Sequence, residues 1–501
     1  MIYLVCLPVA VFLGYLLATP DSMTDLMPVV MVVGVLSFPL LVRWHHLLLV
    51  ASWNTFFITF FLPGQPGLWI VMACLSLSLA LLERTLMKRT KFLHVSSISM
   101  PLILLTCVVL GTAYLTGGIG GRAFGSEVWG GKRYLGLLGA VIGYFALVAR
   151  PIPRERALLY VSLYILSGMT AVLGDLAYAA GSRFEALFAL FNWEVAYLQA
   201  STQGSLRRFA SLTFAAQAVY WFLFLRYGIR GLFDLARPHR LVLMGVAFVV
   251  GLLGGYRSGT ILFVLFCVVQ FLSEGLLRSR FLPAFLLVGV LGGAVLIGFT
   301  DRMPLSIQRS LSFLPVHVDP VAKLDADGTL NWRLEMWRVV WKEVPDHLFF
   351  GKGYGFIGSD LYLTQEAMRR GFFTSFEDTV VSGNYHNGWL TMVIPFGIWA
   401  VICFLWFCWS ALKILRRNQR YGDPELKAIN TFLLSYFVTR LIFYMVFYGQ
   451  FDLDLMVLTG TVGLSVALNG GVRGPESVRE VVIEDEPGLN GAVPSGAPQP
   501  A

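Results

Sequence analysis

Long apolar runs recur from one end of the chain to the other, and short polar or charged segments separate them. A helix of about 17–25 apolar residues is long enough to cross the hydrocarbon core of a bilayer. The pattern therefore predicts an all-α polytopic membrane protein with about 14 transmembrane helices, within a range of about 12–14. The predicted spans are residues 2–18, 27–42, 46–62, 67–82, 98–115, 133–149, 157–175, 209–226, 240–255, 258–273, 281–299, 388–413, 428–447 and 453–468.

One long polar segment, residues 300–387, interrupts this series of apolar runs. It divides the chain into residues 1–299 with predicted helices 1–11, the 300–387 loop with amphipathic helices, residues 388–468 with helices 12–14, and residues 469–501. The last segment is rich in Gly, Pro, Glu and Val and lacks helical periodicity. We expect it to be a disordered cytoplasmic tail.

Positive charge is distributed unevenly among the short loops. Only 14% of the residues are charged, and most Lys and Arg residues of the short loops fall on one side if the N-terminus is cytoplasmic. Because cytoplasmic loops retain basic residues during insertion, we expect both termini inside and the 300–387 loop outside. The net charge of +8 then reflects contact with anionic membrane lipids, and no nucleic-acid partner is indicated. The six cysteines lie in apolar spans away from His or acidic clusters, so neither disulfides nor a metal site is predicted.

One apolar run is too long to be a single span. As one helix, residues 241–272 would extend about 48 Å, well beyond a hydrocarbon core of about 30 Å. The glycines of Gly254-Gly255-Tyr256-Arg257-Ser258-Gly259 predict a break between two short helices, with Arg257 at the junction. A guanidinium there is a candidate anion ligand. The alternative is that Arg257 reaches the membrane interface or pairs with an acid.

The 300–387 loop contains an amphipathic pattern from Asn331 to Val344. Leu334, Trp337, Trp341 and Val344 share one predicted face, and the following proline is expected to end the helix. The tryptophans suit a helix at the level of the lipid headgroups. An ordinary amphipathic helix without a catalytic role remains the alternative.

A histidine stands where this loop re-enters an apolar helix, in Gly383-Asn384-Tyr385-His386-Asn387-Gly388-Trp389-Leu390. Imidazole titrates near neutral pH, which makes His386 a candidate general base, although a lone histidine at a helix start is often structural. Asn387 could orient the ring or cap the helix. The glycine-rich run 351–355 lacks the spacing and the Ser/Thr of a P-loop, so we expect a turn there.

Two further arginines stand where charge is disfavoured. Arg208 precedes the 209–226 span on the predicted outer side. Arg440 lies inside an apolar span and should face a cavity or an acid. Asp452 or Asp454 could be that acid, which would make the role of Arg440 structural.

Taken in order, the blocks Asn331–Trp337, Pro345–Gly355 and Gly383–Leu390 resemble the O-antigen ligase and O-antigen polymerase superfamily, the Wzy_C-like membrane glycosyltransferases. The resemblance spans about residues 200–450 and is strongest at 331–355 and 383–400. It implies a GT-C-like helical fold. Two local departures are visible: Ser258 follows Arg257 where many relatives have the serine before it, and residues 208–211 lack the usual Pro-Asn.

The resemblance implies a metal-independent, cofactor-free glycosyltransferase. Its donor would be an undecaprenyl-diphosphate-linked glycan, and its acceptor a lipid A-core or another glycan on the outer face of the inner membrane. Arg257 would bind the donor diphosphate, with Arg208, Arg333 or Arg440 assisting; Arg333 matches the arginine that precedes a tryptophan in the family pattern.

The resemblance also makes His386 the base that deprotonates the acceptor hydroxyl, with Asn387 and Tyr256 in support. The same pattern is shared by ligases, by polymerases of O-antigen or exopolysaccharide, and by protein glycosylation enzymes, and a ligase in lipopolysaccharide biosynthesis is weakly favoured. A multi-span secondary transporter is the alternative of another class. It fits less well, because the candidate residues cluster at the outer surface rather than near the midplane of repeated halves.

Overall fold

The structure is a computed structural model that describes residues 7–8, 10–15, 27–87, 92–121, 126–180, 190–191, 208–372 and 376–475. The described chain is almost entirely helical, which confirms the predicted all-α class. Its helices are α2 Met27–Ser52, α3 Leu68–Met87, α4 Ser96–Leu115, α5 Gly131–Val148, α6 Ala157–Leu166, α7 Ala171–Ala180, α9 Ala210–Leu232, α10 His239–Leu252, α11 Arg257–Ser273, α12 Phe281–Phe299, α13 Leu305–Leu311, α14 Pro320–Val340, α15 Val344–His347, α16 Gly358–Arg369, α17 Glu377–Val381, α18 Leu390–Tyr421, α19 Lys427–Val446 and α20 Phe451–Asn469. Two short strands, β1 Val128–Trp129 and β2 Phe356–Ile357, pair antiparallel.

Nine helical segments within the described ranges are long and apolar enough to cross a membrane. They comprise α2 to α5, the segment Arg154–Gly174, α12, and α18 to α20, while α10 and α11 are shorter apolar helices. These helices support a multi-pass membrane protein, and the count of about 14 stays a prediction. Most of the predicted span 2–18 and the tail beyond residue 475 lie outside the described residues.

The predicted span 46–62 is wrong as a separate helix. α2 continues to Ser52 across a non-helical Trp44, and its last turns enter the core, where His45 and Leu49 are buried. After Ser52 the chain forms turns and two isolated bridges up to residue 67. The sequence Pro63-Gly64-Gln65-Pro66-Gly67 explains this, because proline and glycine favour turns over helix. Phe56–Leu62 is mostly apolar, and for that reason the sequence predicts a span over residues that form turns.

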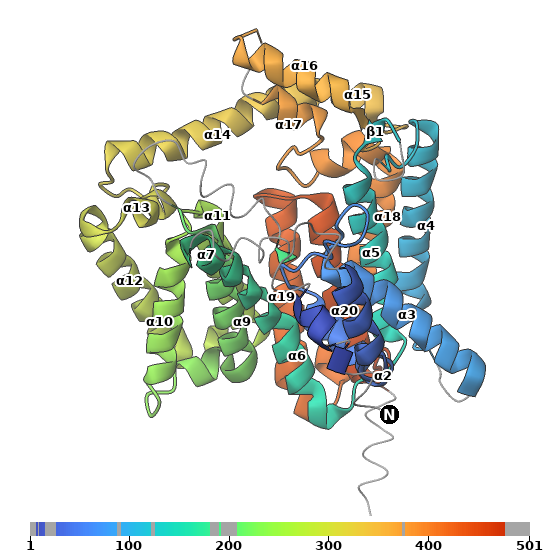
Figure 1. The fold of residues 1–501 in the computed structure, drawn as a ribbon. Helices are drawn as coiled ribbons and strands as arrows, with labels where there is room; N and C mark the ends of the chain where they lie inside the picture. The colour runs from blue at the N-terminus through green and yellow to red at the C-terminus, as the bar shows by residue number, and fades with distance from the viewer. Residues whose placement is uncertain are drawn as a thin grey trace, which may run out of the picture.

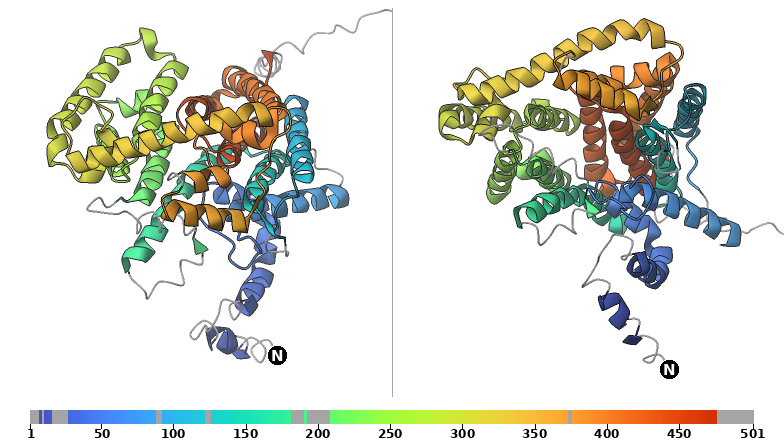
Figure 2. Two further views of the ribbon diagram at one scale, coloured as in Figure 1. Left: turned by 90° about the horizontal axis from the view of Figure 1, so that it is seen from above. Right: turned by 45° about the horizontal axis from the view of Figure 1, so that its top comes forward.

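The helices form a bundle whose centre is α20. α20 packs against α5, α18 and α19, and α4 packs against α18. α9 packs on α10, and α11 packs on α19. Most of α20 is buried, whereas α12 has no buried residue. Figures 1 and 2 show α13 to α17 together at one end of this bundle, with α14 running across it from α13 towards α15.

α14 is longer than the predicted helix Asn331–Val344. It begins at Pro320, because Asp319 caps it by accepting a hydrogen bond from the Val321 N–H and a proline suits the first turn. It ends at Val340, and Pro345 lies inside the following short helix rather than ending the first. The predicted apolar face is also only partly right. Trp337 and Val344 pack against a small core, but Leu334 and Trp341 are exposed.

The glycine run 351–355 confirms the predicted turn and shows its purpose. α18 is interrupted near its start by Pro395 and by Gly397, which has φ of +70°. The Lys352 and Gly353 N–H groups donate to the carbonyls of Ile394 and Pro395, both at 2.9 Å. A Cβ on Gly351 would lie 2.0 Å from the Pro395 carbonyl oxygen, so only glycine allows this contact. The turn thereby attaches the 300–387 segment to the N-terminal end of α18.

Candidate active site

The predicted break in the 241–272 run is confirmed. α10 ends at Leu252, α11 begins at Arg257, and Tyr256 between them has an extended backbone. Gly255 has φ of +72°, a left-handed conformation that favours glycine. Arg257 therefore stands at the first position of α11, and its Nη2 donates a 2.5 Å hydrogen bond to the Ala326 carbonyl of α14.

Arg208 lies against the same break. It precedes α9, and its guanidinium carbon lies 4.7 Å from the centre of the Tyr256 ring. Its Nε donates to the Gly254 carbonyl at 3.4 Å. Tyr256 thus serves as a platform for Arg208, and the structure brings the predicted residues Arg208, Tyr256 and Arg257 together.

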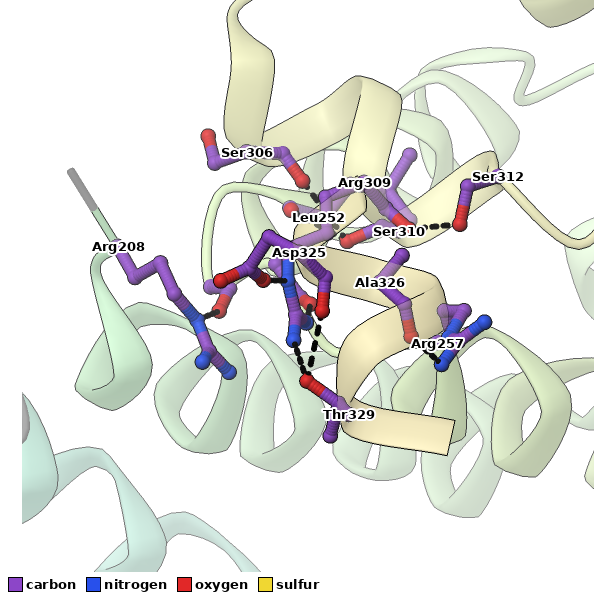
Figure 3. Close-up of polar contacts among 12 residues, drawn as sticks. Arg208, Leu252, Arg257, Ser306, Arg309, Ser310, Ser312, Asp325, Ala326 and Thr329 are labelled. Carbon is purple, nitrogen blue, oxygen red and sulfur yellow. Dashed lines mark hydrogen bonds and ion pairs between the residues drawn. The ribbon is translucent and has the colours of Figure 1, made fainter. Parts of the chain in front are cut away.

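A third arginine, Arg309 of α13, joins this cluster and was missed from the sequence. Its side chain is buried, with 5% exposed, and it donates to the carboxylate of Asp325, to the Gly255 carbonyl and to Thr329 Oγ1. Figure 3 shows Arg309 between Arg208 and Arg257, with Asp325 and Thr329 on α14 facing it. No local signal in Leu305–Leu311 marks this arginine, because its partners lie 16 to 54 residues away along the chain.

The arginines repel one another electrostatically. Burial lowers the pKa of Arg208, and the charges of Arg309 and Arg333 lower it further. Burial and then Arg309 likewise lower the pKa of Arg333, whose buried Nε has no hydrogen-bond partner among the described residues. Asp325 offsets only part of this charge. The cluster is therefore an electropositive site that would favour an anion.

His386 occupies the turn before α18 in an uncommon conformation. Its φ is +51°, in the left-handed region that few residues other than glycine adopt. The imidazole packs against two aromatic rings, with its centre 5.8 Å from that of Trp332 and 5.4 Å from that of Tyr448. Its Nδ1 is 3.2 Å from the Tyr448 hydroxyl oxygen. Burial, together with the charges of Arg333 and Arg133, lowers the pKa of His386 to about 4. The ring is neutral at neutral pH and can accept a proton.

Contacts on both sides hold this turn in place. Trp337 Nε1 of α14 donates to the Tyr385 carbonyl at 2.7 Å. The Tyr444 hydroxyl donates to the Gly388 carbonyl at 2.6 Å. These bonds compensate for the cost of the left-handed backbone at His386.

Arg133, at the start of α5, is a second basic residue near the turn that the sequence did not single out. Its Nη1 donates to the Ser382 carbonyl at 2.9 Å, and its guanidinium carbon lies 5.1 Å from the centre of the Tyr354 ring. Since α5 lies about 250 residues upstream of this turn, periodicity in the sequence could not predict the contact.

The predicted capping role of Asn387 is confirmed. Its Oδ1 accepts hydrogen bonds from the N–H groups of Trp389 and Leu390 at 3.0 and 3.2 Å. These are N–H groups at the start of α18 that would otherwise lack an intrahelical partner.

Arg440 has the acidic partner that its position suggested. Its Nη2 lies 3.6 Å from Asp454 Oδ1, and the Gln450 N–H donates to the same carboxylate at 2.9 Å. The Gln450 side chain in turn donates to Asn384 Oδ1, two residues before His386. Among the described residues, Arg440 is linked to the candidate site through Asp454, Gln450 and Asn384.

The fold and the site together define a multi-pass helical membrane protein with a histidine and several arginines beneath a helix that crosses one end of the bundle. Residues 241–405 match the family model described as O-antigen ligase, which confirms the resemblance to that superfamily. This match supports a membrane role like that of O-antigen ligases and polymerases, whose family comprises glycosyltransferase-like enzymes. The matched region contains Arg257, Arg309, Arg333 and His386, while Arg208, Arg440 and Tyr448 lie outside it. A search of curated proteins found no match.

Proposed function

We propose that this protein is a membrane glycosyltransferase that transfers a glycan from an undecaprenyl-diphosphate carrier to a lipid A-core or similar acceptor. Transfer would take place on the outer face of the inner membrane, in the biosynthesis of a cell-envelope glycan. The observation that carries the proposal is that His386 and Arg333 both contact Tyr448, while Arg257 and Arg309 of the neighbouring cluster contact α14, the helix that carries Arg333. The family match over residues 241–405 supports it.

The arginines supply what the leaving group needs. When the bond between the anomeric carbon and the diphosphate oxygen breaks, the electron pair stays with that oxygen and negative charge develops there. Guanidinium groups bind phosphate oxygens in a bidentate manner, and fixed donors in a partly dry site stabilise developing charge. We assign this role to Arg257 and Arg333, with Arg208 assisting. Their mutual repulsion in the free protein adds to the gain from binding an anion.

His386 supplies the base. Its Nε2 would take the proton of the acceptor hydroxyl while the acceptor oxygen forms its bond to the anomeric carbon, and a single displacement would invert that carbon. The free imidazole is a weak base because burial, and then the charges of Arg333 and Arg133, lower its pKa. A diphosphate bound beside Arg333 would offset that charge and raise the pKa of His386, so the base would strengthen when the donor is in place.

Arg440 takes a different role from the one expected for a diphosphate ligand. Its ion pair with Asp454 supports the structural alternative, in which it stabilises the start of α20. We therefore propose that Arg440 acts on the site indirectly, through Gln450 and Asn384.

The test is the undecaprenyl-linked glycan of a host that lacks this protein, complemented with wild type, His386→Ala or Arg257→Ala. Both variants should reach wild-type protein levels in the membrane and restore no transfer. Accumulated long chains in the deletion host would identify ligation, and accumulated single repeat units would identify polymerisation. Wild-type transfer by both variants would refute the mechanism, and solute uptake without transfer would favour a transporter.

A further inference from the structure

Tyr448, in the turn between α19 and α20, contacts both halves of the candidate site. Its hydroxyl oxygen lies 3.2 Å from His386 Nδ1, and the two rings lie 5.4 Å apart at 30°. On the same side chain, the Arg333 guanidinium carbon lies 5.4 Å from the ring centre. One side chain therefore contacts both the candidate base and a candidate diphosphate ligand.

The direction of the hydroxyl contact depends on the tautomer of the imidazole. A neutral imidazole has one protonated and one free nitrogen, and the hydrogen bond at one nitrogen decides which is which. If Nδ1–H donates to the Tyr448 oxygen, Nε2 is left with the lone pair that a general base needs. Burial raises the pKa of Tyr448, so the phenol stays neutral and can accept this bond. When Nε2 then takes a proton, the Nδ1–H bond becomes charge-assisted and stronger.

The ring of Tyr448 contacts the other half of the candidate site, the guanidinium of Arg333. An arginine over an aromatic face is held by cation–π attraction without using its N–H donors. The donors of Arg333 therefore remain available for an anion, and its buried Nε has no partner among the described residues. The ring thereby places this guanidinium beside His386.

We propose that Tyr448 is a positioning residue for both steps: its hydroxyl sets the tautomer of His386, and its ring holds Arg333 in place for the donor diphosphate. This inference rests on the proposed function and extends it to a residue outside the matched region 241–405. The two parts of the side chain have separable effects, because one acts on proton transfer and the other on donor binding.

The experiment compares Tyr448→Phe and Tyr448→Ala in purified protein, with undecaprenyl-diphosphate-linked glycan as the donor. Tyr448→Phe keeps the ring and should lower kcat by roughly tenfold to a hundredfold at an unchanged donor KM, because a hydrogen bond to a charged group is lost. Tyr448→Ala should lower kcat similarly and also raise the donor KM by several-fold.

Tyr444→Phe is the matched control. It removes a hydroxyl from the last turns of α19, just before Tyr448, and this hydroxyl donates to the Gly388 carbonyl rather than contacting the imidazole. It should lower the unfolding temperature. It should not show the pattern that distinguishes the two Tyr448 variants, in which Phe lowers kcat alone and Ala also raises the donor KM. A Tyr448→Phe variant with wild-type kcat, or equal effects of Phe and Ala on KM, would overturn the role of Tyr448 alone. Wild-type protein that neither transfers glycan nor binds undecaprenyl diphosphate would overturn this role and the proposed function together.

Discussion

Replacing Arg309 with methionine is the most direct way to separate the architecture of the site from its chemistry. Methionine keeps much of the apolar stem but removes the donors to Gly255, Asp325 and Thr329. The Gly255 carbonyl is then left without its partner in a buried position, which costs about 1–3 kcal/mol. Asp325 contributes less, because its side chain is 45% exposed and an ion pair of that kind contributes about 0–1 kcal/mol. The expected loss of stability is therefore about 1–4 kcal/mol.

The effect on binding follows from the position of Gly255. Two residues later Arg257 opens α11, so a peptide that moves at Gly255 displaces the candidate diphosphate ligand. We expect equilibrium binding of undecaprenyl diphosphate to weaken by about tenfold, the equivalent of one well-placed charge-assisted hydrogen bond. Arg309→Lys should rescue only part of this loss, because an ammonium group cannot reproduce the planar fork that serves three acceptors.

The assay pairs thermal unfolding in detergent with binding of the same lipid. Arg302→Met is the matched control, because Arg302 lies seven positions upstream and is exposed. It should change stability by less than about 0.5 kcal/mol. An Arg309→Met variant with the unfolding midpoint and lipid affinity of the wild type would refute the reasoning. A loss of stability with intact lipid affinity would show that Arg309 stabilises α13 but does not position Arg257.

Three other outcomes can be checked independently. Only neutral His386 can act as a base and its pKa is about 4, so kcat/KM should stay constant from neutral pH down to about pH 5 and fall towards pH 4. A loss of half of kcat/KM already near pH 6.5 would contradict this. Asp454→Leu should lower the free energy of unfolding by about 3–5 kcal/mol, because it leaves the charge of Arg440 unpaired, and adding Arg440→Met should recover much of that loss. Additive losses of the two substitutions in thermal unfolding would contradict a buried ion pair. Gly351→Ala would place a Cβ 2.0 Å from an α18 carbonyl oxygen, so it should lower both the unfolding midpoint and glycan transfer. Gly328→Ala in α14, where the added Cβ meets open space, should be neutral or stabilising, and equal effects of the two substitutions would refute the contact.

Parts of this site were predictable because their signals are local. The break before Arg257 follows from the length of the apolar run and from two adjacent glycines, and the structure confirms it. Asn387 precedes an apolar helix at the spacing of a cap, and its side chain forms that cap. The acid partner of Arg440 could be narrowed to Asp452 or Asp454 because a charge in an apolar span requires one. In each case the deciding residues lie within one segment or in two neighbouring helices.

The remaining parts depend on contacts between distant segments. Nothing in Leu305–Leu311 indicates that Arg309 is buried, since its acceptors come from α14 and from the α10–α11 break. Tyr448 follows an apolar helix and looks like an ordinary interfacial aromatic until the fold places it on His386. The start of α14 at Pro320 has a local signal, the Asp319 cap followed by proline. The apolar positions between Asn331 and Val344 nevertheless predicted a shorter helix with later boundaries.

α14 connects the two halves of the candidate site through a single face. Asp325, Thr329, Arg333 and Trp337 follow one another at four-residue intervals, so their side chains share one side of the helix over about 18 Å. The first two bind Arg309, and the last two contact Tyr448 and the carbonyl of Tyr385 at the His386 turn. A helix is stiff along its axis, so we expect a shift of α14 at the arginine cluster to move the contacts that it makes with Tyr448 and with the His386 turn. Three of these four positions carry polar residues, and the fourth, Trp337, uses its Nε1–H to bind the turn.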